Sequence, residues 1–99
     1  MTPHVFSSKT PNEIVPLSFD FSAVLTLVSA VASLTISVVD GTDADVATML
    51  DGAAEIQGPI VVQMVRGGVD GVTYELRCLA ANGAERYELV GQLPVDAIT

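Results

Sequence analysis

Two runs of alternating apolar and polar residues flank the dipeptide Asn82-Gly83, within the stretch from Gly67 to Val95. Alternation with a period of two indicates β-strands that have one buried and one exposed face. Asn-Gly suits the positive φ angles of a two-residue type I′ turn. The pattern therefore predicts a β-hairpin at the C-terminal end of the chain, and we expect the rest of the fold to be organised around it.

A turn at Asn82-Gly83 also sets the cross-strand register. Ala81 then pairs with Ala84, and Arg77 lies opposite Glu88 as an opposite-charge pair that favours this register. The other face of the hairpin is expected to be apolar and pairs Tyr74, Leu76 and Cys78 with Gly91, Leu89 and Tyr87.

The first half of the chain predicts two more strands. One runs from Glu13 to Phe21. Pro16 within it predicts that this strand lies at a sheet edge or is broken there, because proline cannot donate to a ladder. A brief helical turn is expected over 22–27, followed by a strand that ends at Gly41. The side chains expected to face inward from these two strands are Leu17, Phe19 and Phe21, then Leu34, Ile36 and Val38.

The middle of the chain is less regular. Val46 to Leu50 fits a short helix and a short strand equally well. A minor strand is expected from Ala54 to Gln57, ended by Gly58-Pro59. The β-branched run Ile60 to Arg66 predicts a strand. We expect its dry face to carry Ile60, Val62 and Met64, which leaves Val61 and Val65 pointing outward.

About six or seven short antiparallel strands with closely spaced turns predict an all-β fold, an immunoglobulin-like β-sandwich. Residues 13–99 form this domain, and residues 1–12, which contain two prolines and no periodicity, are expected to be an extended N-terminal arm. The segment Asp70 to Tyr74 resembles a tyrosine corner, in which a buried phenol hydroxyl bonds a nearby backbone group. The disulfide and tryptophan of antibody domains are missing.

Composition narrows the function. The 99 residues suit one domain, and with 49% apolar residues the chain is not disordered. The net charge of −8, with only four scattered Lys and Arg, argues against nucleic-acid binding. The single cysteine, Cys78, excludes an internal disulfide frame and a thiolate metal site, and is compatible with synthesis in a reducing cytoplasm.

One stretch is long enough to cross a membrane. Phe21 to Val39 carries no charge, but it holds six Ser or Thr residues, is flanked by Asp20 and Asp40, and alternates in its second half. No Lys or Arg lies nearby to set an orientation, and the N-terminus does not resemble a signal peptide. A strand is the preferred interpretation, with a small single-span membrane protein as a minor alternative.

No residue pattern indicates catalysis, so we expect no enzyme activity and no cofactor. His4 is the only histidine and lies in the expected arm, and Cys78 lies on the apolar hairpin face. The glycines of Gly67 to Gly71 lead from strand to strand, so we expect a hairpin turn there rather than a phosphate-binding loop. The densest acidic group consists of Asp40, Asp43, Asp45 and Asp51. This group lacks the spacing of a calcium-binding loop, so a calcium-binding module is only a minor alternative.

Five landmarks follow one another along most of the chain. They are a Lys-x-Pro-x-Glu start, an Asp-Phe-Ser strand end, a long apolar strand closed by glycine, the Gly-Gly-x-x-Gly-x-x-Tyr turn and the final hairpin. The residues of the four motifs before the hairpin are Lys9, Pro11, Glu13, Asp20 to Ser22, Gly41, Gly67-Gly68, Gly71 and Tyr74. The order of these landmarks resembles small structural proteins of tailed bacteriophages, in particular the fibre–tail adaptor group, which has an immunoglobulin-like fold.

The resemblance implies a non-catalytic virion protein of the tail or neck that joins neighbouring components, such as fibres to the tail, and contacts copies of itself. Positions expected to be apolar and outward support protein contacts; they are Val5, Phe6, Val61, Val65, Leu79 and Val90. A capsid decoration or cement protein is the alternative within the virion. We expect no nucleic-acid or membrane partner.

Overall fold

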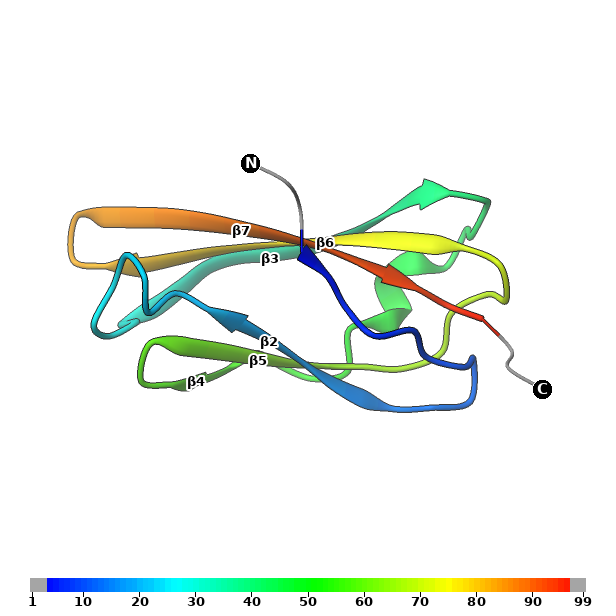
Figure 1. Cartoon of the computed structure of the whole chain (residues 1–99), viewed down its shortest axis with the longest axis horizontal. Helices are drawn as coiled ribbons and strands as arrows, with labels where there is room; N and C mark the ends of the chain where they lie inside the picture. Colours follow the sequence, from blue (N-terminus) through cyan, green and yellow to red (C-terminus); the bar gives the residue numbers. More distant parts are fainter. Residues whose placement is uncertain (1–3, 97–99) are drawn as a thin grey trace.

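The protein is a β-sandwich of two sheets, seen in a computed structural model that describes residues 4–96 (Figure 1). The four-stranded sheet has the order β1-β7-β6-β3, and its strands are β1 (His4–Val5), β7 (Glu85–Pro94), β6 (Thr73–Asn82) and β3 (Ala30–Asp40). The three-stranded sheet has the order β2-β5-β4, with β2 (Val15–Asp20), β5 (Ile60–Val65) and β4 (Glu55–Gln57). The predicted all-β sandwich is confirmed, and the immunoglobulin-like assignment stays a prediction.

All strand pairs are antiparallel except β1 with β7, which is parallel. The core lies between the sheets, where alternate side chains of both sheets meet. Tyr74, Leu76 and Leu93 of the larger sheet are fully buried, as are Val61 and Val65 of the smaller one. The remaining fully or nearly buried apolar side chains are Phe6, Leu17, Phe19, Phe21, Leu25, Val28, Met49, Val72, Cys78, Ala80, Ala81 and Val95.

Strand β2 follows its sequence pattern. Leu17, Phe19 and Phe21 are buried as predicted, and β2 lies at an edge of its sheet. The Phe21 N–H donates to the Pro59 carbonyl at 3.0 Å, so the odd-numbered residues of β2 bond to β5. Pro16, which has no N–H to give, therefore faces the free edge, and the expected edge position is confirmed.

The long strand β3 is also confirmed, and Gly41 ends it with a φ of 106° that glycine adopts readily. Residues 22–24 form a turn in which the N–H groups of Val24 and Leu25 donate to the Phe21 carbonyl, and 22–27 contains no helix. The open choice at Val46 to Leu50 is decided for a helix, because Val46–Met49 form the short 3-10 helix η1. The minor strand was also predicted correctly, as β4.

The hairpin of β6 and β7 has a different register from the predicted one. Asn82 pairs with Glu85, so the two-residue loop is Gly83-Ala84, and Arg77 lies opposite Val90 rather than Glu88. Gly83 has a φ of 63°, whereas neither Asn82 nor Ala84 has a positive φ, which is the pattern of a type II′ turn. The shift is two residues, so every side chain keeps its predicted face.

Strand β5 has its two faces exchanged relative to the prediction. Val61, Gln63 and Val65 face the core, whereas Ile60 and Val62 are half-buried on the outer side and Met64 is exposed. Gln63 is tolerated inside because its side-chain amide donates to the carbonyls of Gly52 at 3.1 Å and Met64 at 2.9 Å. The predicted outward positions of Val61 and Val65 are therefore wrong.

The connection from β5 to β6 also differs from expectation. Gly67, Gly68 and Gly71 have positive φ angles, as expected of a turn, but β5 and β6 belong to different sheets. The segment Gly67 to Gly71 therefore crosses between the layers instead of closing a hairpin. Across residues 4–96, no helix combines the length and the apolar character needed to cross a membrane.

Candidate protein-interaction site

Residues 4–10 run alongside the end of β7 and form what we call the N-terminal strap (Figure 1, dark blue). The Phe6 N–H donates to the Gln92 carbonyl at 2.8 Å, and the Lys9 N–H donates to the Pro94 carbonyl at 3.2 Å. The Asp96 N–H returns a bond to the Lys9 carbonyl at 2.8 Å. The described part of the expected arm therefore adds a strand-like edge to the larger sheet. Residues 1–3 of the arm lie outside the described residues.

Phe6 holds the strap to the core. Its side chain is only 8% exposed, and its ring meets the Phe19 ring edge to face with centroids 5.5 Å apart. A methyl group at Gly91 would overlap the Phe6 ring, so the absence of a side chain at Gly91 leaves the space that the ring occupies, which we call the seat of Phe6. Phe6 was expected to face a neighbouring subunit, and this expectation is wrong because the ring packs inside its own chain.

Lys9 is the second attachment of the strap. Its side chain is almost fully buried, and its ammonium group donates to the carbonyls of Thr10 and Gly67. Burial lowers the pKa of Lys9, and the nearby Glu13 carboxylate opposes that shift. Because Gly67 lies in the crossing between the sheets, Lys9 ties the strap to that crossing.

Three of the predicted contact residues share the outer face of the larger sheet, and we call Val5, Leu79 and Val90 the outer apolar patch. Val5 pairs with Gln92, two residues from Val90, and Leu79 pairs with Glu88. Val5 is 61% exposed, and Leu79 and Val90 are half-buried. The patch therefore presents apolar side chains to solvent, as predicted.

Charged side chains interrupt the outer face beside this patch. The Arg77 guanidinium lies 2.8 Å from a Glu75 carboxylate oxygen and 3.4 Å from a Glu88 carboxylate oxygen. The predicted contact between Arg77 and Glu88 thus exists, although it is diagonal across the ladder. Exposed pairs of this kind add little stability. They give the outer face a mixture of apolar and charged groups, which is typical of a rim around a protein contact.

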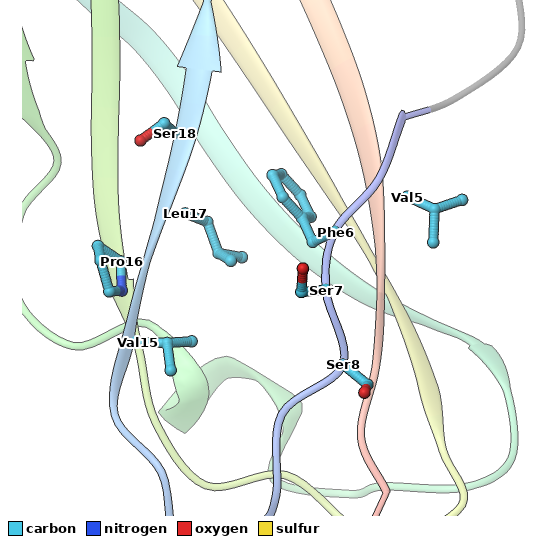
Figure 2. Close-up of a pocket in the computed structure, with 8 residues that line it drawn as sticks. All are labelled: Val5, Phe6, Ser7, Ser8, Val15, Pro16, Leu17 and Ser18. Atoms are coloured by element: carbon cyan, nitrogen blue, oxygen red, sulfur yellow. The ribbon is translucent and has the colours of Figure 1, made fainter.

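A groove of about 390 Å³ separates the strap from β2, and Figure 2 shows its lining. Phe6 points from the strap toward β2, whereas Val5 points away from it. Val15 and Leu17 extend from β2 toward the strap. The complete lining is Val5, Phe6, Ser7, Ser8, Val15, Pro16, Leu17 and Ser18.

The groove lies between the edges of the two sheets, so unpaired backbone groups border an apolar floor. Even-numbered residues of β2 turn their backbone polar groups toward this free edge, as the ladder with β5 requires. Such an edge accepts an extended segment of another chain by backbone hydrogen bonding. Pro16 lacks an N–H and limits how many bonds an added strand gains.

The tyrosine corner is confirmed as a structural feature. Tyr74 is fully buried, and its hydroxyl accepts the Val69 N–H at 2.9 Å and donates to an Asp43 carboxylate oxygen at 2.7 Å. Burial raises the pKa of Tyr74, and the bond to Asp43 adds to that effect. Asp43 lies 31 residues earlier in the chain, so sequence reasoning did not identify it as the partner.

The remaining titratable candidates form no reactive centre in the described part of the chain. Burial raises the pKa of the Cys78 thiol to about 11, so it is protonated at neutral pH and unsuited to nucleophilic attack. Residues 4–96 hold no cluster of three or more His, Cys, Asp or Glu side chains that could hold a metal ion. The side chain of His4 lies outside what the structure describes.

The structure thus brings together half of the predicted contact residues. Val5, Leu79 and Val90 share one face, whereas Phe6, Val61 and Val65 are in the core. Sequence reasoning missed the buried Lys9 and the close approach at Gly91. A glycine inside a strand is the available signal for a close approach; nothing in the pattern marks Lys9 as buried.

Comparison with known proteins yields one family. A family model described as "Podophage GP4 fiber-tail adaptor protein gp77" matches residues 9–89, which include the strands from β2 to β6 and the start of β7. Neither the comparison with curated proteins nor that with solved structures gave a match.

Proposed function

The chain belongs to the podophage fibre–tail adaptor family, and from that premise we propose that it is a non-catalytic structural component of a bacteriophage virion. Its role is to join components of the tail or neck, such as fibres to the tail, through contacts with neighbouring subunits and with copies of itself. It is synthesised in the host cytoplasm and assembles into the virion. The match over 9–89 carries this proposal.

The surface of the protein supports a role in assembly. An adaptor needs exposed groups that contact other proteins, and the outer apolar patch supplies such groups beside the pairs of Arg77. Val5 of this patch also borders the groove at the strap. We assign the outer apolar patch and the groove to contacts with adjacent virion proteins.

Charge supports the same role. The net charge of −8 leaves the protein repelled by the DNA that is packaged and ejected close to a tail or neck component. Contacts with virion proteins then proceed without competition from the genome.

The test is incorporation into particles. A phage that lacks this chain is complemented with the wild type or with a Val90→Glu variant, and the purified particles are analysed for the chain and for fibres. We expect wild-type protein in tail fractions and fibre-bearing particles, and loss of both with Val90→Glu because a charge replaces a contact residue.

A matched control is Thr26→Glu, which adds the same charge in an exposed loop outside both surfaces. It is expected to assemble normally. Chain recovered with heads rather than tails would favour a capsid decoration or cement protein instead. Fibre-bearing particles without the chain would refute the adaptor role.

A further inference from the structure

Strand β3 forms the second edge of the larger sheet, and in the described chain no strand pairs with its outer side. The order of this sheet, β1-β7-β6-β3, leaves β3 paired on one side only, with β6. At 11 residues it is the longest strand in the described chain. From Ala30 to Val39 it has no charged residue and no proline. A long, uncharged, unpaired edge is a template for adding another strand.

The other sheet edges carry protection that β3 lacks. The strap covers one end of β7, and the rest of that edge carries Glu85, Arg86 and Glu88. Strand β2 has Pro16 facing its free edge, and β4 has only three residues. Strand β3 has only bulges as protection, one after Val31 and one after Val38, and its register is regular between them.

We propose that two copies of this chain pair antiparallel along the regular segment Ser33–Val38 of β3, and so join their larger sheets into one continuous sheet. The uncharged edge is where two copies can meet. With a net charge of −8, two copies repel one another over most of their surfaces, whereas 21–39 contributes no charge, so two β3 edges approach without like charges between them. Antiparallel pairing also places the two Asp40 side chains at opposite ends of the shared ladder, whereas parallel pairing would bring them together.

The side chains of β3 complement themselves under a two-fold axis normal to the sheet. Such an axis pairs residues of the same face, so exposed Ser33, Thr35 and Ser37 meet their own kind across the ladder. The inner face pairs Leu34, Ile36 and Val38 in the same way. These three are half-buried and packed against the core, and the second copy covers their exposed part.

This inference deepens the self-association in the proposed function and assigns a surface to it. It is tested on the isolated full chain, independently of the virion. Molar mass is measured by light scattering after gel filtration over a wide range of concentrations. We expect a concentration-dependent dimer of the 10.3 kDa chain.

A charge at the centre of β3 is expected to break this dimer. Thr35→Lys and Thr35→Glu each place two like charges across the two-fold axis, and each should raise the dimer dissociation constant about tenfold or more. Thr26→Lys adds the same charge as Thr35→Lys, but in an exposed loop, and should leave the dimer dissociation constant unchanged. Far-ultraviolet circular dichroism confirms that each variant is folded.

Disulfide trapping locates the contact. Cysteine is placed singly at Ser33, Thr35 or Ser37, and at Ser18 on the free edge of β2 as a matched control. Mild oxidation should give a covalent dimer for at least one β3 variant and none for Ser18→Cys. Native Cys78 is buried and does not interfere.

Three results overturn the proposal: a monomer at every concentration, a dimer unaffected by both Thr35 variants, or cross-linking through Ser18→Cys in place of β3. A monomer that still enters tails would reject the β3 dimer and leave the adaptor role standing. A β3 dimer that is absent from particles would reject the adaptor role alone.

Discussion

The two edges of the four-stranded sheet differ, because the N-terminal strap covers part of one edge and no strand of the described chain covers the other. At the β7 edge the chain's own N-terminal strap adds a strand, inserts Phe6 into the core and buries the ammonium group of Lys9. At the β3 edge, no strand of the described chain pairs with the side of β3 that faces away from β6. The β7 edge with its strap therefore stabilises the monomer, whereas the outer side of β3 is available for association with another chain.

The difference has a simple physical origin. Phe6 brings a large apolar ring to a place where Gly91 leaves room for it, so docking of the strap removes apolar surface from water. Along its edge, strand β3 offers backbone groups, which water can satisfy, and side chains that are exposed or half-buried. A change at the strap should thus alter unfolding, whereas a change at the β3 edge should alter assembly.

The largest effect on stability is expected from Phe6→Ala. Removal of a buried aromatic ring costs about 3–5 kcal/mol in free energy of unfolding, because transfer energy is lost and a cavity forms. Urea unfolding measures this loss. Val5→Ala is the matched control on the same strap, since Val5 points outward, and it should change stability by no more than about 0.5 kcal/mol. Equal effects of the two substitutions would mean that Phe6 does not anchor the strap.

Gly91→Ala should destabilise by about 1–3 kcal/mol, because the added methyl group overlaps the Phe6 ring and forces the strap to shift. A double-mutant cycle isolates the cause. In the Phe6→Ala background the methyl group has room, so the same substitution should cost much less. Additive losses would assign the effect to the backbone of β7 rather than to the seat of Phe6.

Lys9→Ala should lower the free energy of unfolding by about 1–3 kcal/mol, since the half-buried carbonyl of Gly67 loses its donor and the packed aliphatic stem is removed. Lys9→Met keeps most of the stem and should restore part of the loss. Urea titrations of both variants, run beside the wild type, separate the two contributions. No difference between Ala and Met would show that the stem does not matter.

Strand β6 lies between the two edges, and its buried Cys78 makes the free energy of unfolding depend on pH. Burial raises the pKa of this thiol from 9.0 to about 11, so the unfolded chain releases the proton first. Unfolding free energy should therefore fall as pH rises from about 9 to about 11, with Tyr74 acting in the same direction. Thermal unfolding of Cys78→Ala should have a smaller slope over this range, and an unchanged slope would contradict the assignment.

The smallest effect on monomer stability is expected at the open edge. Thr35 is exposed on the outer face of β3, so Thr35→Lys should change the unfolding free energy by no more than about 0.5 kcal/mol in dilute protein. Urea unfolding at concentrations where the chain is monomeric measures this. A loss comparable with that of Phe6→Ala would remove the distinction between the two edges.

Much of this fold was predictable because alternation is a local property. Strands β2, β3, β6 and β7, the edge position of Pro16 and the buried Tyr74 followed from period-two patterns and from turn residues. The hairpin loop was misplaced because Asn82-Gly83 and Gly83-Ala84 both supply a glycine for the turn, and the two registers keep the same faces.

The contact surface was harder to predict than the fold. Strand β5 is apolar on both faces, and Gln63 made its buried face appear the wetter one. Gln63 can be buried on that face because its side-chain amide donates to the carbonyls of Gly52 and Met64. Phe6 appeared to be a contact for a neighbouring subunit because Gly91, which leaves room for its ring, lies far from it in the sequence.

The sequence by itself determined that this protein is a small acidic β-sandwich, because periodicity, turn residues and charge are local properties of the chain. The adaptor family was indicated separately, by the resemblance of its motifs to those of phage adaptor proteins. The tertiary structure alone decided which face of β5 is inside, where the hairpin turns, and that the strap closes one sheet edge and leaves the other open. Those choices depend on contacts between distant residues, such as Phe6 with Gly91 and Lys9 with Gly67. Pattern sets which residues alternate, and packing sets which of the alternating sets is buried.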